Sequence, residues 1–135
     1  MAAPTQDRHT TILVIDDQPF FISMMQNLLQ GQGYQVVVAS NGDEGLAQAK
    51  KHRPDAILLD IEMPGKNGFV VCQALKQDAD LKHIPVIILT ATQDTKLNEK
   101  AFRAGATITA TKSMAGERLL NTLSMTLKQA KPPAV

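Results

Sequence analysis

The chain has few of the residues that stabilise small proteins by disulfides or aromatic packing. Of its 135 residues one is cysteine, one is tyrosine and none is tryptophan, and aromatic residues make up 4%. A single cysteine, Cys72, cannot form an internal disulfide, and its place in VVCQAL favours a small buried side chain over a nucleophile. We therefore expect an aliphatic core and a reducing, cytoplasmic location.

Long apolar runs and an excess of one charge are also absent. No apolar run approaches the roughly 18 residues that a membrane span needs, and the opening MAAPTQDRHT lacks the apolar centre of a signal peptide. The formal net charge of +1 gives no general attraction for nucleic acid or an acidic membrane. We expect neither nucleic-acid binding nor membrane insertion.

The length and composition predict one globular domain. Hydrophobic residues make up 44% of the chain and charged residues 20%, which is typical of a folded protein and not of a disordered one. We place the domain at 11–130, after a disordered lead-in at 1–10 and before a short tail, KPPAV, at 131–135.

Short apolar runs alternate along the chain with segments of helical period. Strands are expected at 11–15, 35–39, 56–59, 85–89 and 107–110. Helices are expected after Pro19, Asn41 and Asn67, and at 94–104 and 115–130. The third and fourth strands are apolar throughout, as in parallel sheets covered on both faces. The pattern predicts an α/β fold with an open, doubly wound, five-stranded parallel sheet and helices on both faces.

Polar residues follow the expected strands at their carboxyl ends, where doubly wound sheets bind ligands. They are Asp16 and Asp17, Asp60, Thr90 and Lys112. Two carboxylates about 4 Å apart repel by about 4 kcal/mol at an effective dielectric near 20. A divalent cation would offset that repulsion, and Mg²⁺ binds carboxylates while keeping waters that a phosphate can replace. Taken singly, these residues have ordinary alternatives as helix caps, a strand former and a surface amine.

The stretch DIEMPGKNG at 60–68 extends this pattern. Together with the acidic pair, the ILTA motif at Thr90-Ala91, Gly105-Ala106 and Lys112, it makes residues 11 to about 130 resemble the receiver domain of two-component response regulators, of the stand-alone chemotaxis-regulator type. The resemblance implies a flavodoxin-like strand order, 2-1-3-4-5.

The resemblance also implies the chemistry. Asp60 would accept a phosphoryl group from the phosphohistidine of a sensor histidine kinase or a histidine phosphotransfer protein, forming an acyl phosphate. Lys112, Thr90 and Ala91 would contact the phosphoryl oxygens. Mg²⁺, for which Mn²⁺ could substitute, would be held by Asp16, Asp17, Asp60 and the backbone carbonyl of Glu62. The chain would catalyse only its own phosphorylation and dephosphorylation, and so would not be an enzyme for a separate substrate.

The family's switch is only partly matched. The resemblance implies that Thr90 turns toward the phosphoryl group and moves the face formed by 94–104, 107–110 and 115–130, to which a downstream protein binds. Its partner in the switch is usually aromatic, whereas this chain has Thr109. Ser113 stands where a proline commonly follows the lysine through a cis bond. A cis bond before a non-proline residue costs about 2.5 to 4 kcal/mol, so we expect a trans bond.

The first expected helix carries more apolar residues than core packing requires. Its apolar arc spans about 200°, against roughly 100° for a core-facing stripe. Phe20 and Met24 at its edge are candidates for docking the kinase, with ordinary packing as the alternative.

Three functions are compatible with these residues. The favoured one is a phosphoacceptor, monomeric or weakly dimeric, that signals by protein contact. The second is a receiver-like interaction module that acts without phosphorylation, which Thr109 and Ser113 favour. The third is a phosphohydrolase with an aspartyl nucleophile, whose usual helper acid is matched only by Glu62.

Overall fold

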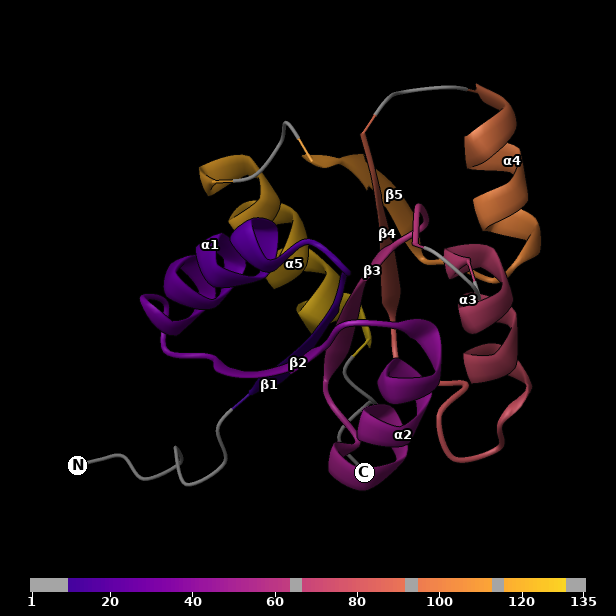
Figure 1. The fold of residues 1–135 in the computed structure, drawn as a ribbon, viewed down its shortest axis with the longest axis horizontal. Helices are drawn as coiled ribbons and strands as arrows, with labels where there is room; N and C mark the ends of the chain where they lie inside the picture. The colour runs from indigo at the N-terminus through magenta and orange to yellow at the C-terminus, as the bar shows by residue number, and fades with distance from the viewer. Residues whose placement is uncertain (1–9, 64–66, 92–94, 113–115, 131–135) are drawn as a thin grey trace.

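The structure, a computed structural model, describes residues 10–63, 67–91, 95–112 and 116–130. Within these ranges strands and helices alternate along the chain (Figure 1). The strands are β1 (Thr11–Ile15), β2 (Gln35–Ala39), β3 (Ala56–Asp60), β4 (Val86–Thr90) and β5 (Ile108–Thr111). The helices are α1 (Pro19–Gln30), α2 (Gly42–His52), α3 (Gly68–Gln77), α4 (Thr95–Arg103) and α5 (Glu117–Ala130).

The five strands form one parallel sheet in the order β2-β1-β3-β4-β5. Helices α1 and α5 cover one face, and α2, α3 and α4 cover the other (Figure 1). The predicted α/β class, the two-sided helical cover and the flavodoxin-like order are therefore confirmed.

The core consists of two aliphatic clusters separated by the sheet. In β1, Ile12 and Val14 pack with the buried residues of α1 and α5, whereas Leu13 and Ile15 pack with those of α2 and α3. This alternation follows from the two-residue period of a strand. Because both faces are covered, β3 and β4 are buried along their whole length, as their continuous apolar runs predicted, whereas β2 at the edge of the sheet is only half-buried.

Helix starts follow the expected capping chemistry. The Asn41 side chain accepts a hydrogen bond from Glu44 N at 2.8 Å, and the Asn67 side chain accepts one from Val70 N at 3.1 Å. Pro19 occupies the first turn of α1, where its missing N–H breaks no helical bond.

Three strands end one residue later than predicted, and two of them, β4 and β5, also begin one residue later. Pro85 has no N–H to donate, so β4 starts at Val86 and not at 85. Asp60 keeps a ladder partner in Leu89, and Thr90 keeps one in Thr111. Asp60 and Thr90 are therefore the last residues of β3 and β4, and not the first residues of loops. The fifth strand covers 108–111 in place of 107–110.

Some predictions concern residues outside the described ranges. These are the lead-in at 1–9, the tail at 131–135, the expected helix starts at 94 and 115, and the peptide bond before Ser113. Among the described helices, none is long and apolar enough to cross a membrane.

Candidate functional site

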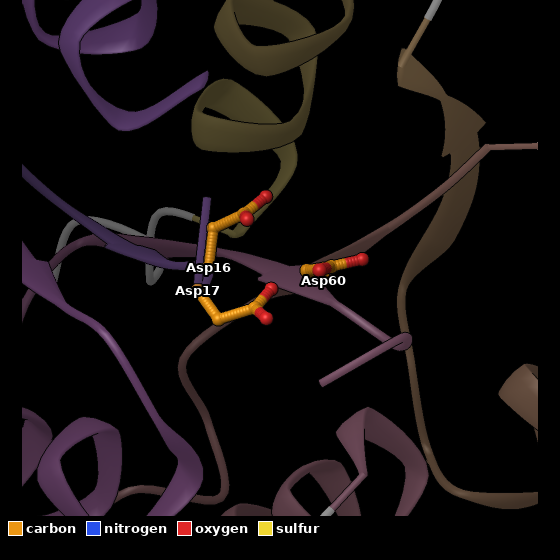
Figure 2. Close-up of side chains that lie close together, drawn as sticks. All are labelled: Asp16, Asp17 and Asp60. Atoms are coloured by element: carbon orange, nitrogen blue, oxygen red, sulfur yellow. The ribbon is translucent and has the colours of Figure 1, made fainter. Parts of the chain in front are cut away.

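Three carboxylates meet at the carboxyl edge of the sheet (Figure 2). Asp16 and Asp17 follow β1, and Asp60 ends the neighbouring strand β3. One carboxylate oxygen from each lies within 4.8 Å of the other two. Asp16 and Asp60 are each only 1% exposed, whereas Asp17 is half-buried. The structure thus brings together the acids that the sequence placed at separate strand ends.

Lys112, directly after β5, brings a positive charge to this cluster. Its Nζ lies 2.9 Å from Asp16 Oδ2 and 3.6 Å from Asp60 Oδ2. It also donates a hydrogen bond to Gln18 Oε1 at 3.0 Å and lies 4.6 Å from the centre of the Phe21 ring. Since its side chain is only 17% exposed, Lys112 is not the solvated surface amine of the ordinary alternative.

Backbone N–H groups orient two of the carboxylates. Asp16 Oδ1 accepts from Gln18 N at 2.8 Å, and Asp60 Oδ1 accepts from Glu62 N at 3.1 Å. The second oxygen of each, Oδ2, is the one nearer to Lys112. Asp16 Oδ2 is buried and has no hydrogen-bond partner in the described part of the chain, so its short contact with the ammonium is an ion pair only.

Gly68 lets the start of α3 lie directly against the end of β3. A Cβ atom at this position would be 2.5 Å from the Asp60 carbonyl oxygen and 2.6 Å from Ile61 Cα. Both are backbone atoms that cannot rotate away. Glycine is therefore required for the turn that carries Asp60 and Glu62.

The Asp60 carboxyl holds its proton more tightly than an ordinary aspartate. Burial above all, helped by the charges of Asp16 and Asp17 and opposed by the Glu62 N–H and Lys112, raises its pKa from the usual 3.8 to about 6. Burial and like charge thus both disfavour the ionised form. A cation beside Asp60 would favour it.

The donor set fits a hard divalent cation. It offers carboxylate oxygens only, it includes the buried Asp16 Oδ2 that lacks a hydrogen bond, and it gathers three like charges within one small space. Mg²⁺ prefers such oxygen ligands and is bound in proteins by one or two carboxylates together with water. Among the residues that the structure describes, no cysteine or histidine joins this acidic cluster.

The residues expected to contact a phosphoryl group lie on the adjacent strands. Thr90 ends β4 beside Asp60 and is buried, whereas Ala91 is exposed. Thr109 of β5 pairs with Ile88, two residues before Thr90. Because alternate residues line one face of a strand, Thr90 and the half-buried Thr109 both lie on the face that α3 and α4 cover.

Two large apolar side chains are exposed on the outer side of α1, as the wide arc predicted. Phe20 is 81% exposed and Met24 is 36% exposed, whereas Phe21, Met25 and Leu29 are buried. A hollow of about 400 Å³ beside them is lined by Met24, Asn27, Leu28 and Gly116.

Cys72 is fully buried and its Sγ donates to the Ala104 carbonyl oxygen at 3.4 Å. Burial raises its thiol pKa to about 11. The prediction of a packing role and not a nucleophile is confirmed, because thiolate formation is disfavoured at neutral pH.

The sequence did not reveal that Gln18 and Phe21 contact Lys112. It also did not reveal that Gly68 is needed for the close packing of α3 against the end of β3. Gln18 and Phe21 contact Lys112 across more than 90 residues of chain, and no spacing pattern signals such a contact. The signal for Gln18 was its place between the acidic pair and Pro19, which puts it at the start of α1.

A parallel sheet in this order, with three acids and a lysine at its carboxyl edge, defines a receiver-type protein. The family model of the response regulator receiver domain matches residues 12–124. The chain therefore belongs to the response regulator receiver family of two-component systems, whose members signal through phosphorylation.

Bacterial relatives match over most of their length. Protein PilH of Pseudomonas aeruginosa is 39% identical over 116 residues, covering 86% of this chain and 96% of PilH. The polar-differentiation response regulator DivK of Brucella anthropi is 32% identical over 120 residues, covering 89% of this chain and 98% of DivK. The solved structure of the Vibrio cholerae chemotaxis protein CheY4 is similar, with a TM-score of 0.85 and 32% identity, covering 88% of this chain and 99% of CheY4.

Proposed function

We propose that this chain accepts a phosphoryl group on Asp60 from the phosphohistidine of a sensor histidine kinase or a histidine phosphotransfer protein, and then binds a downstream protein. The observation that carries the proposal is the surrounding of Asp60: a buried carboxylate within 4.8 Å of two other acids, with the Lys112 ammonium 3.6 Å away.

The transfer needs little covalent chemistry from the protein. An Asp60 oxygen attacks the phosphorus, the P–N bond breaks, and its electron pair returns to the donor imidazole. Asp60 Oδ2 is suited to the attack because Oδ1 accepts the Glu62 N–H. Phosphoryl transfer depends mainly on positioning and electrostatics, so an ionised aspartate needs no general base.

Mg²⁺, or Mn²⁺ in its place, would be held by Asp16, Asp17, Asp60 and the backbone carbonyl of Glu62. When bound, it would neutralise charge that gathers on the phosphoryl oxygens. The bound ion would favour the ionised form of Asp60, which burial disfavours, and so would lower its raised pKa.

Lys112, Thr90 and Ala91 would hold the phosphoryl oxygens. Lys112 offers an ammonium that already lies beside Asp60, Thr90 offers a hydroxyl at the end of the adjacent strand, and Ala91 offers a backbone N–H. Thr90 ends β4, Ala91 follows it and Lys112 follows β5, so the added group would draw the ends of these two strands toward Asp60.

Output would pass from Thr90 to the face made by α4, β5 and α5. Phe102 of α4 is 81% exposed and Ile108 of β5 is 41% exposed on these elements, so apolar surface is available to a partner. Thr109 is too small to fill the space of an aromatic switch residue. We therefore propose that it contributes to the switch by yielding space to the Thr90 loop.

The kinase or phosphotransfer protein would dock on α1. Phe20 and Met24 are exposed there, next to the hollow lined by Met24, Asn27, Leu28 and Gly116. An amphipathic helix can place one apolar side chain in a hollow of this kind. We further propose a cytoplasmic protein, monomeric or weakly dimeric, that has no separate substrate, does not bind nucleic acid and does not insert into membranes.

Intact mass measured after incubation with Mg²⁺ and acetyl phosphate tests the function. We expect a mass increase of one phosphoryl group in the wild type and in Asp80→Asn, an exposed acid, but not in Asp60→Asn. A wild type that forms no adduct would favour a receiver-like module that acts without phosphorylation. Rapid repeated hydrolysis of phosphate esters would favour a phosphohydrolase.

A further inference from the structure

Gln18 occupies the N-cap position directly before α1, but its side chain does not cap the helix. Its backbone is extended, with φ −98° and ψ 111°, and its side chain makes no capping hydrogen bond. Helix caps normally use the short side chains of Ser, Thr, Asp or Asn. The longer Gln18 side chain instead reaches Lys112, whose Nζ donates to Gln18 Oε1 at 3.0 Å.

Gln18 itself is held in place by its neighbours. Its backbone N–H donates to Asp16 Oδ1 at 2.8 Å, and Pro19 follows it with a restricted φ angle. The amide oxygen therefore projects from a constrained backbone next to the acidic cluster.

The Lys112 ammonium is closer to the α1 side of the site than to Asp60. It lies 2.9 Å from Asp16 Oδ2 and 3.0 Å from Gln18 Oε1, against 3.6 Å from Asp60 Oδ2. Asp16 and Asp60 are carboxylates of the acidic cluster that fits a cation, whereas Gln18 contacts Lys112 through a neutral amide. Gln18 is thus a neutral contact that can hold Lys112 while the carboxylates serve a cation.

We propose that Gln18 is a positioning residue that tethers the Lys112 ammonium beside Asp60; its role in phosphorylation rests on the proposed function. A lysine side chain is flexible and has many rotamers. The amide oxygen and the Phe21 ring restrict those rotamers before the phosphoryl group arrives. Removal of the acceptor should slow phosphorylation by about two- to tenfold, as expected for one partly exposed hydrogen bond to a charged donor.

Nitrogen-15 NMR of the Lys112 ammonium tests the tether in the unphosphorylated, metal-free protein. A hydrogen-bonded, shielded ammonium exchanges its protons slowly enough to be observed. We expect the signal in the wild type and in Gln18→Glu, which keeps an acceptor, and its loss in Gln18→Met, which is of similar length without one. Gln30→Met, at the exposed end of α1, is the matched control and should leave the signal unchanged.

A double-mutant cycle then tests whether Gln18 acts through Lys112. Phosphorylation rates with acetyl phosphate and Mg²⁺ are compared for the wild type, Gln18→Met, Lys112→Ala and the double variant. We expect Gln18→Met to slow the wild type but to have little further effect when Lys112 is absent.

An unchanged Lys112 signal in Gln18→Met, or the same rate loss in both backgrounds, would overturn the proposal. The NMR result does not depend on phosphorylation. A wild type that forms no adduct but shows the Gln18-dependent signal would therefore contradict the proposed function and leave the tether established.

Discussion

At the scale of single residues, Asp60 lies buried in the candidate site, and its ionisation there destabilises the folded protein. It is 1% exposed, and its pKa is raised to about 6 from 3.8, first by burial and then by the neighbouring acids. Because the folded state binds this proton more tightly than the unfolded state does, the metal-free protein loses stability as the pH rises from about 4 to about 6.

Asp60→Asn should therefore stabilise the metal-free protein at about pH 7. A pKa shift from 3.8 to about 6 corresponds to about 2 to 3 kcal/mol in the free energy of unfolding. The gain should shrink toward about pH 4, where Asp60 is protonated in the folded state. Urea unfolding with a chelator present, across this pH range, measures it. Glu99→Gln on α4 is the exposed control, and an equal gain there would contradict the argument.

Gly68→Ala should disturb both stability and the site. The new Cβ would meet the Asp60 carbonyl oxygen at 2.5 Å, so the backbone of the β3–α3 turn must shift. We expect a loss of about 1 to 3 kcal/mol in the free energy of unfolding, and weaker Mg²⁺ binding measured by calorimetry.

Gly31→Ala is the matched control for Gly68→Ala. Its backbone is right-handed helical with φ −63°, and its nearest contact is 3.3 Å to Asn27 O, so the change should be small. A Gly68→Ala variant as stable as Gly31→Ala, with unchanged Mg²⁺ binding, would argue against the close packing.

The main residues of the candidate site could be predicted because strand ends converge. Asp16, Asp17, Asp60 and Lys112 each lie at the carboxyl end of an expected strand, and a parallel sheet gathers such positions at one edge. Gln18 could not be predicted to contact Lys112, since a surface glutamine carries no periodic or compositional signal. Long-range side-chain contacts depend on rotamers that the pattern does not encode.

At the scale of elements, helix starts were predicted better than strand ends. Asn41, Asn67 and Pro19 act through local chemistry that is visible in the sequence. The ends of β3 and β4 depend on ladder partners in other strands, and these partners extend pairing to Asp60 and Thr90. A polar residue after an apolar run therefore indicates a loop by pattern alone, although Asp60 and Thr90 belong to their strands.

Helix α1 offers a test of docking that is separate from the chemistry. Phe20 on α1 and Phe102 on α4 are both 81% exposed, so neither change to alanine should alter the free energy of unfolding by more than about 0.5 kcal/mol. We expect Phe20→Ala to slow transfer from a phosphorylated histidine phosphotransfer protein about tenfold, as for an interface hot spot. The rate of phosphorylation by acetyl phosphate should not change.

Phe102→Ala should leave the rate of phosphorylation by both donors unchanged, because α4 lies on the opposite face of the sheet from α1 (Figure 1). Equal slowing of transfer by the two variants would indicate that surface apolarity in general, and not α1, determines docking. Equal slowing with acetyl phosphate by Phe20→Ala would indicate damage to the site itself.

At the scale of the whole molecule, the acidic edge of the sheet would couple the stability of the fold to a bound cation. β1 and β3 are neighbours, and their packing forces Asp16, Asp17 and Asp60 together whether or not an ion is bound. The repulsion among them opposes folding of the metal-free chain. Unfolding separates the strands and disperses the ligands, so a cation that binds this site binds the folded state only.

Mg²⁺ should therefore raise the thermal unfolding midpoint. At ten times its dissociation constant it should stabilise the fold by about 1.4 kcal/mol, or about 3 to 6 °C for a domain of this size. Differential scanning calorimetry with and without Mg²⁺ measures the shift. Asp17→Asn removes one ligand and should lose most of it, whereas Asp80→Asn, an exposed acid, should keep it.

Asp60→Asn has two opposite effects that can be measured separately. It relieves the repulsion among the three carboxylates, and it weakens the binding of Mg²⁺. Without Mg²⁺ its unfolding midpoint should lie above that of the wild type at about pH 7, and on addition of Mg²⁺ it should rise less. The gap between the two proteins should therefore narrow as Mg²⁺ is titrated in. Parallel midpoints at every Mg²⁺ concentration would mean that the cation binds elsewhere and that the acidic edge carries no part of the coupling.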